Sequence, residues 1–207
     1  MLAIYVAYDS SLDAFERGCV HEAMRKFASE FPQRKVVIYG AKSWSTGKFS
    51  SADWYIDNAK KLHNGLQVDA WSVINLLIME PWQKGNPHID IILTARDLGR
   101  EDLNYCFGMT AGRYTVQSVF RYRHLSVDDR RRAIEAVIWH ELGHVFMCAG
   151  NPHRTHIVHD LYGKHCTNPG CVMQRVRDLP DLVRIARGVR REMYCPQCLA
   201  DIARSYD

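Results

Sequence analysis

Two motifs stand in the stretch from Ser126 to Met173. The first is His140-Glu141-Leu142-Gly143-His144, and the second is His165-Cys166-Thr167-Asn168-Pro169-Gly170-Cys171-Val172-Met173. Apolar residues recur in the first half of this stretch at steps of three and four, as on one face of a helix. Ser126 with Asp129 predicts a capping box at the start of this helix, and Gly150 followed by Pro152 predicts its end. The motif around His140 therefore lies in the last turns. The apolar stripe consists of Ile134, Val137, Ile138, Leu142, Val145 and Cys148.

The motif places the imidazoles of His140 and His144 about one helical turn apart on one face, where both can reach one metal ion. Glu141 lies beside that face. A carboxylate there can take a proton from a zinc-bound water, whose pKa is about 7, and pass it to a leaving amine. The motif thus predicts metal-assisted amide hydrolysis. The alternative is a chance match in a helix whose histidines only satisfy core polarity, since the chain contains 10 histidines.

Four cysteines form two close pairs, Cys166 with Cys171 and Cys195 with Cys198. Four thiolates at such spacing suit a closed tetrahedral zinc site. A redox role for Cys195-Pro196-Gln197-Cys198 is the weaker alternative, because the pair lacks a strand-to-helix context and has a ready partner pair. The remaining cysteines stand singly in apolar segments as small core residues: Cys19, Cys106 and Cys148.

Composition and charge favour a compact protein. The 207 residues, 47% of them hydrophobic, fit one domain or one domain with a small appendage. The net charge of +4 is too small and dispersed to indicate nucleic acid or a membrane surface as a partner. No signal peptide precedes the first predicted strand, and no apolar run approaches the length of about 18 residues that a membrane helix needs. We therefore expect a cytoplasmic protein whose cysteines are thiols or metal ligands.

Strand and helix patterns alternate in the first part of the chain. Short apolar runs predict strands at 2–8, which should be central, at 35–40 and at 88–93. The order strand, helix, strand within 2–40 predicts a right-handed crossover and a parallel pair. Helical spacing predicts helices at 10–31, 52–62 and 68–79, of which the last could also be a strand, and 41–50 has the composition of a loop.

The later segments are less regular. Residues 105–109 and 114–122 flank Ala111-Gly112 and predict a hairpin that ends in an edge strand. An extended substrate would add to that edge strand, near 114–121. Residues 151–164 look like a polar loop that would shape the cleft, and 179–193 predict a basic helix.

These motifs together resemble the archaemetzincins, a family of zinc peptidases in the metzincin clan. The family joins a His-Glu-x-x-His helix to a His-Cys-x4-Cys-x-Met run and a later Cys-x2-Cys, and all three parts stand here in order. The segment 107–121 is also similar to the strands ahead of the family's helix, so the resemblance covers roughly 88–200. It implies that Glu141 is general base and acid and that Met173 lies in a tight turn beneath the histidines. It further implies a catalytic zinc on His140, His144 and His165 and a structural zinc on Cys166, Cys171, Cys195 and Cys198.

The third histidine is displaced from the family's usual place. That pattern puts a glycine three residues after the second histidine and the third ligand three beyond it, but Met147 and Gly150 stand there. His165 keeps its place beside Cys166, which implies an insertion between helix and ligand. Gly150-x-x-His153 reproduces the usual spacing after a shift, so His153 is an alternative, as are His156, His159 or no third histidine. His88 opens a strand and is better explained as a solvated or hydrogen-bonded side chain than as a ligand.

We therefore predict an α/β fold with a mixed, mainly parallel sheet, a long active-site helix and a small zinc-stapled C-terminal subdomain. Residues 1–150 would form the α/β part and 151–207 the part with the third ligand, the Met173 turn and the thiolate site. The predicted function is a metalloendopeptidase-like hydrolase with two zinc ions per chain, acting on a peptide or protein substrate. Two alternatives remain: a zinc-binding regulatory or scaffold protein with a vestigial site, and a hydrolase of other amides or esters.

Overall fold

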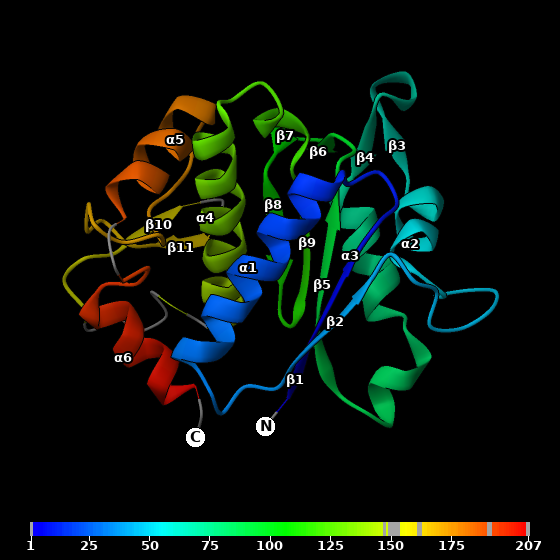
Figure 1. The fold of residues 1–207 in the computed structure, drawn as a ribbon, viewed down its shortest axis with the longest axis horizontal. Helices are drawn as coiled ribbons and strands as arrows, with labels where there is room; N and C mark the ends of the chain where they lie inside the picture. Colours follow the sequence, from blue (N-terminus) through cyan, green and yellow to red (C-terminus); the bar gives the residue numbers. More distant parts are fainter. Residues whose placement is uncertain (1, 147, 149–153, 161–162, 190–191, 206–207) are drawn as a thin grey trace. The chain divides into compact units, whose positions relative to one another are not determined.

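The computed structural model describes residues 2–146, 148, 154–160, 163–189 and 192–205 (Figure 1). The chain divides into two compact units, Met1–Arg123 and His124–Asp207. The helix that carries the His140 motif lies in the second unit, whereas the sequence placed it with the first 150 residues. All residues expected to bind zinc therefore belong to one unit.

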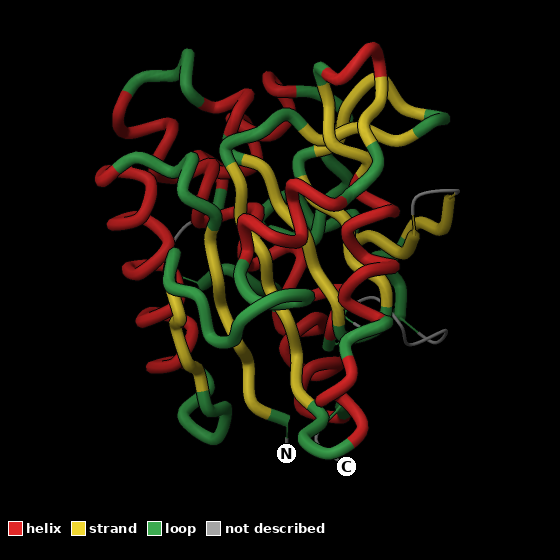
Figure 2. Tube along the Cα trace, turned by 90° about the vertical axis from the view of Figure 1, so that its right-hand side faces the viewer, coloured by secondary structure: helices red, strands yellow, loops and turns green. Residues whose placement is uncertain are grey.

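The first unit is built on a five-stranded sheet with the order β2-β1-β5-β9-β8. Its strands run side by side in Figure 2. β1 pairs in parallel with both β2 and β5, which confirms the predicted central strand and the parallel pair. β9 is parallel to β5, and only β8 is antiparallel to its neighbour. The predicted α/β class with a mainly parallel sheet is confirmed. The strands are β1 (Ala3–Tyr8), β2 (Val36–Gly40), β5 (His88–Thr94), β8 (Gly108–Ala111) and β9 (Tyr114–Ser118).

Helices lie on both faces of this sheet (Figure 1), as a parallel sheet requires. α1 (Ala14–Glu30) begins at a capping box in which Asp13 and Glu16 each accept from the other's backbone N–H. α2 (Ala52–Asn58) and α3 (Ala70–Ile78) lie on the opposite face. Their apolar side chains form one core with residues of the sheet. This core includes Tyr55, Ile56, Val73, Ile74 and Leu77 from the helices and Ala7, Ile92 and Val116 from the strands.

The two predicted helices before β5 were too long. Residues 61–62 and 67–69 are short strands, β3 (Lys61–Leu62) and β4 (Gln67–Asp69), in a second sheet with the order β3-β4-β6-β7. α3 starts after Asp69, whose side chain accepts a hydrogen bond from the backbone N–H of Trp71. Apolar spacing does not reveal such a cap, so it extended the helix backward. The remaining strands of this sheet are β6 (Leu98–Arg100) and β7 (Leu103–Cys106).

The predicted hairpin is present, but its edge strand was assigned wrongly. β8 and β9 turn at Gly112, which has a φ of +60°. β9 pairs with β5 on one side and β8 on the other, so β8 is the edge strand. The expectation that a substrate adds to 114–121 is therefore wrong. Thr115 and Gln117 misled the prediction because polar residues alternating with apolar ones indicate a half-exposed strand, yet both are buried.

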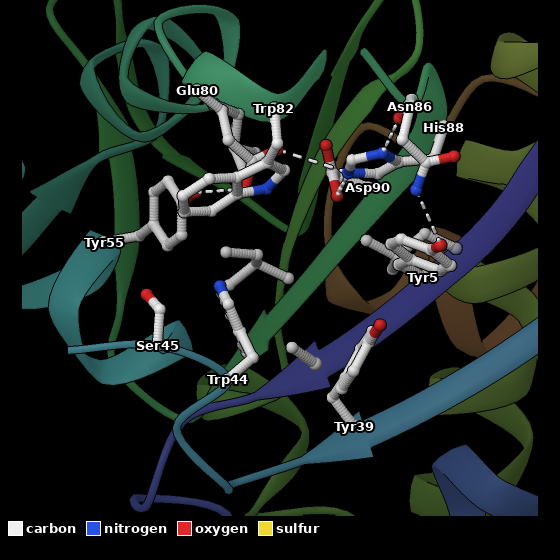
Figure 3. A pocket seen from close by; sticks show the side chains of 14 residues that line it. Tyr5, Tyr39, Trp44, Ser45, Tyr55, Glu80, Trp82, Asn86, His88 and Asp90 are labelled. Carbon is white, nitrogen blue, oxygen red and sulfur yellow. Dashed lines mark hydrogen bonds and ion pairs between the residues drawn. The ribbon is translucent and has the colours of Figure 1, made fainter. Parts of the chain in front are cut away.

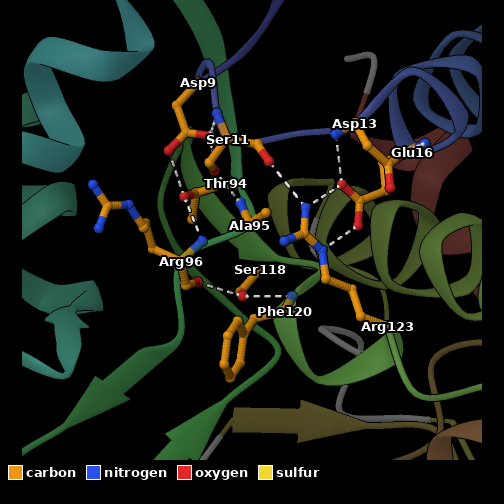
Figure 4. Close-up of polar contacts among 10 residues, drawn as sticks. All are labelled: Asp9, Ser11, Asp13, Glu16, Thr94, Ala95, Arg96, Ser118, Phe120 and Arg123. Atoms are coloured by element: carbon orange, nitrogen blue, oxygen red, sulfur yellow. Dashed lines mark hydrogen bonds and ion pairs between the residues drawn. The ribbon is translucent and has the colours of Figure 1, made fainter.

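The sheet has a pocket on one face and a polar network at the carboxyl ends of its strands. A pocket whose lining includes five tyrosine and tryptophan side chains opens on the face covered by α2 and α3 (Figure 3). At the carboxyl ends, a polar network joins three strands (Figure 4). Asp9 accepts from the hydroxyls of Ser11 and Thr94, at 2.5 and 2.6 Å, and Ser118 donates to the carbonyl of Arg96. These bonds satisfy the polar groups where the chain leaves the sheet.

The second unit contains α4 (Val127–Val145), with the His140 motif in its last turns as predicted. Ser126 caps the helix by accepting from the backbone N–H of Asp129. The predicted end at Gly150 lies outside the described residues. α5 (Leu179–Gly188) packs against α4, and the guanidinium of Arg187 donates two hydrogen bonds to Asp129, at 2.6 and 2.7 Å. Along the described chain, no helix is both long enough and apolar enough to cross a bilayer.

Three elements of this unit differ from the prediction. Part of the expected polar loop 151–164 is an antiparallel hairpin, β10 (Val158–Asp160) with β11 (Gly163–His165). The basic helix is shorter than predicted, as α5 (Leu179–Gly188). α6 (Pro196–Arg204) was not predicted. It begins with Cys195 as its N-cap residue and Pro196 in the first turn, where proline is well tolerated.

Candidate metal centres

Three histidines from two elements meet in the second unit. α4 supplies His140 and His144, and β11 ends at His165. One ring nitrogen of each lies within 4.8 Å of the others, and His140 and His165 are buried. The ring centroid of His165 lies 5.3 Å from that of His140 and 5.0 Å from that of His144. This arrangement can hold one metal ion.

Hydrogen bonding orients the first of these ligands. His140 Nδ1 lies 2.9 Å from the carbonyl oxygen of Val172, which can only accept, so Nδ1 carries the proton. Nε2 is left as a lone-pair donor, and it faces His144 Nε2 at 3.1 Å. Burial lowers the pKa of both histidines, which favours the neutral ligand form. Two converging nitrogens of this kind suit a shared metal ion.

Met173 lies beneath the histidine helix, in the place that the resemblance implied. It is fully buried, and its Sδ fills the space beside Gly143, where a Cβ atom would overlap it. The Met173 carbonyl accepts from the backbone N–H of Cys166 at 2.8 Å. This bond closes the loop between His165 and Met173, so the third histidine and the Met173 turn are held by the same short segment.

His165 is delivered by the β10–β11 hairpin, which the sequence did not predict. Val158 is its cross-strand partner. Gly163, with a φ of +118°, starts β11, and a Cβ atom there would lie 3.8 Å from the ring of His144. His156 and His159 are exposed, and neither belongs to a described cluster of metal-binding side chains. His153, the other alternative, lies outside the described residues.

The four cysteines predicted to bind zinc also come together. The four sulfur atoms lie within 4.8 Å of one another, and all four cysteines are buried. Sγ of Cys166 lies 3.7 Å from that of Cys195, and Sγ of Cys171 lies 3.5 Å from that of Cys198. The backbone N–H groups of Asn168 and Cys195 donate to Cys166 and Cys171, each at 3.4 Å. Such donors stabilise thiolates, the form that binds metal.

Arg154 also belongs to this cluster, and the sequence gave no signal for it. Its buried guanidinium donates to the sulfurs of Cys166 and Cys198, at 3.2 and 3.3 Å, and pairs with buried Asp201 at 2.5 Å. A cation offsets part of the negative charge of four thiolates, and Asp201 fixes its position. Arg154 stands in a polar stretch where no periodicity marks it as buried.

Glu141 is buried in α4 between the two histidines of the motif. Next to the motif, the rings of Trp139 and Tyr194 pack with centroids 5.5 Å apart and planes tilted by 51°, and the Tyr194 hydroxyl donates to the Trp139 carbonyl. This contact fixes the rotation of the last turns of α4. The direction in which the helix presents His140 and His144 is therefore fixed in part by the packing of Tyr194 and Met173 against the same turn.

Several solved structures share this fold. Archaemetzincin from Methanopyrus kandleri has a TM-score of 0.68 and 19% sequence identity, over 99% of this chain and 95% of that one. Archaemetzincin from Archaeoglobus fulgidus, complexed with malonate, has a TM-score of 0.61 and 19% identity, over 97% and 99% of the two chains. A zinc-dependent peptidase from Methanocorpusculum labreanum has a TM-score of 0.64 and 19% identity, over 97% and 100%. No family model and no curated protein sequence matches the chain. The chain has the fold of the archaemetzincin structures over nearly its whole length.

Proposed function

We propose that this protein is a zinc-dependent metallopeptidase whose catalytic zinc is held by His140, His144 and His165. The observation that carries the proposal is the convergence of these three histidines, two from the His-Glu-x-x-His helix and one distant in sequence. The shared fold supports it, because the similar structures are described as archaemetzincins and a zinc-dependent peptidase.

The donor sets fit two different kinds of zinc site. Three neutral imidazoles leave a fourth position free, as in catalytic zinc sites. Four thiolates close the coordination sphere, as in structural zinc sites. The proposed structural ligands are Cys166, Cys171, Cys195 and Cys198.

Zinc in the histidine site would polarise the scissile carbonyl and lower the pKa of an attacking water. Glu141 would take a proton from that water and return it to the leaving amine. The carbonyl of Val172 would hold the ring of His140 by accepting a hydrogen bond from Nδ1, and Met173 would support the helix from beneath. The substrate would be a peptide or protein.

The test replaces Glu141 by Gln, which keeps the side-chain size and removes the base. Hydrolysis of a peptide library should fall by about 10²- to 10⁴-fold while both zinc ions remain bound. Glu135→Gln, the same substitution earlier in the same helix, should keep full activity. Zinc content measured on each variant separates loss of the base from loss of the metal.

A Glu141→Gln variant with near-wild-type turnover would refute the peptidase assignment. A wild-type protein that binds both zinc ions but cleaves no peptide would instead fit a regulatory or scaffold role. Cleavage of small amides or esters without cleavage of peptides would favour a different hydrolase.

A further inference from the structure

The first unit contains a pocket of about 280 Å³ that the proposed peptidase does not use. It lies on the sheet face covered by α2 and α3, and its lining residues are contributed by segments between β1 and β5 (Figure 3). A well-formed pocket with convergent polar groups is a candidate site for a small ligand.

Aromatic rings form much of the pocket wall. The ring centroids of Tyr39 and Trp44 are 5.7 Å apart, and those of Trp44 and Tyr55 are 6.3 Å apart. Tyr5 lies edge-on to Tyr39 at 5.3 Å. Trp82 completes the set. The faces of such rings carry negative potential and attract cations.

An unusual polar group lies at the side of these rings. His88 Nε2 lies 3.2 Å from an oxygen of Glu80 and 3.0 Å from an oxygen of Asp90, and all three side chains are buried or nearly so. His88 Nδ1 lies 2.6 Å from the carbonyl oxygen of Asn86. Carboxylates and carbonyls only accept, so both ring nitrogens of His88 carry protons. The geometry therefore favours the imidazolium form of His88.

The pKa values agree with this protonation. Burial disfavours the charge on His88, but its hydrogen bonds to Asp90 and Glu80 outweigh this effect and raise the pKa of His88 to about 10. Burial, together with the charge of Glu80, raises the pKa of Asp90 to about 6, which leaves it mainly ionised at neutral pH. Two carboxylates and one imidazolium leave a net charge of −1.

Within the described structure, no lysine or arginine lines this pocket, so apart from His88 no side-chain cation balances its buried carboxylates and the net charge of −1 remains. Buried charge without a partner is costly. Asp90 has accepting capacity left, since its oxygens receive one bond each, from His88 and Gln83. The buried hydroxyl of Ser45 has no hydrogen-bond partner in the described residues and adds a further polar contact point.

A bare divalent ion fits this group less well. Nε2 of His88 is already a donor to both carboxylates, and Gln83 donates to Asp90 at 2.6 Å. A metal ion would have to displace the Nε2 proton, and it would gain nothing from the aromatic rings. An organic cation uses both the ring faces and the excess negative charge.

We propose that this pocket binds a small organic cation, a substituted ammonium ion, held against the aromatic rings and balanced by Glu80 and Asp90. The proposal is independent of the peptidase assignment, because none of its residues is a proposed zinc ligand.

The test is calorimetric titration of the zinc-loaded full chain with choline and with 3,3-dimethyl-1-butanol, in which carbon replaces the charged nitrogen. Choline should bind at least about tenfold more tightly than its neutral isostere. Glu80→Gln and Trp44→Leu should each weaken choline binding by about tenfold or more. Trp71→Leu should not, because Trp71 is half exposed and does not line the pocket.

Equal affinity for the two compounds, or no binding of either at millimolar concentration, would overturn the proposal. So would binding of Mn²⁺ or a third zinc ion that His88→Gln abolishes, because that result assigns the group to a metal. If Glu80→Gln fails to fold, Trp44→Leu and Tyr39→Leu decide the matter, since both side chains are partly exposed at the pocket. Unchanged choline binding in these two variants would refute the proposed site.

Discussion

At the scale of single residues, Gly143 shows how the helix and the Met173 turn fit together. Glycine within a helix costs roughly 0.5–1 kcal/mol relative to alanine, so its presence between Leu142 and His144 needs a reason. The reason is contact: Met173 Sδ occupies the place of a Cβ atom, with Tyr194 behind it. The glycine lets the turn that follows His165 approach the backbone of the helix.

Gly143→Ala should therefore destabilise the second unit by about 1–3 kcal/mol, because Met173 is fully buried and has little room to move. Urea denaturation of zinc-loaded protein measures the effect. The double variant Gly143→Ala with Met173→Val should recover part of the loss, since valine has no atom at the position of Sδ.

Gly18→Ala is the matched control for this prediction. Gly18 lies in α1 with open space around it, so alanine should stabilise the first unit by about 0.5–1 kcal/mol. A Gly143→Ala variant as stable as the wild type would show that Met173 yields without cost.

Arg154 makes a related point about charge. A buried guanidinium beside neutral thiols would be unfavourable, because burying a cation is costly without anionic partners. The position of Arg154 therefore favours cysteines in the thiolate form. Asp201 of α6 accepts from Arg154, which ties α6 to the cluster by charge as well as by sulfur, and from Arg204 of the same helix.

At the scale of elements, the β10–β11 hairpin explains how His165 can be a ligand despite its distance from the helix. Antiparallel pairing fixes the backbone of His165 opposite Val158. On the other side, Cys166 is held by the bond from its N–H to the Met173 carbonyl. Ordering the backbone beforehand lowers the entropy cost of using this side chain.

His165→Ala should accordingly abolish activity and the catalytic zinc while keeping the thiolate-bound zinc. His156→Ala should keep both, because His156 is exposed. His153→Ala should also keep both. Zinc content and peptide cleavage, measured on all three variants, distinguish the assignments. Loss of the catalytic zinc in His153→Ala, with retention in His165→Ala, would move the third ligand to His153.

Helices and strands with a clear pattern of apolar residues were predictable from the sequence. The buried runs of β1 and β5 and the long stripe of α4 gave the parallel sheet and the site helix, and the paired cysteines gave the thiol cluster. What failed depended on tertiary partners. The β10–β11 strands have three residues each, too few for a period to show, and α6 is positioned by Cys195 and Cys198.

The edge strand was predicted wrongly, and the burial of His88 was not foreseen, for another reason. Polar residues that are buried by long-range pairing look exposed in sequence, as Thr115 and Gln117 did. His88 was predicted as solvated or hydrogen-bonded, and it is hydrogen-bonded but fully buried. Its partner Glu80 lies before the strand, in a segment that no motif marked. The spacing of residues along the sequence cannot reveal that such groups lie together in the fold.

At the scale of the whole molecule, both proposed zinc sites lie in the second unit and neither in the first. A structural zinc contributes about 10–16 kcal/mol in small domains, comparable with or larger than the net stability of about 5–15 kcal/mol of a typical domain. The unit His124–Asp207 should therefore depend on metal, whereas Met1–Arg123 has its own sheet and core.

Calorimetric unfolding of the full chain tests this. Protein purified without chelator should carry two zinc ions, and a strong chelator should remove the histidine-bound ion before the thiolate-bound one, because the all-thiolate site is closed and anionic. Loss of the second ion should abolish the unfolding transition of the second unit while that of the first persists. Cys195→Ser should have the same effect, and Cys106→Ser, in β7 of the first unit, should keep both ions. A single transition that chelation shifts as a whole would show that the two units unfold together, and a transition insensitive to chelation would show that the thiols hold no structural metal.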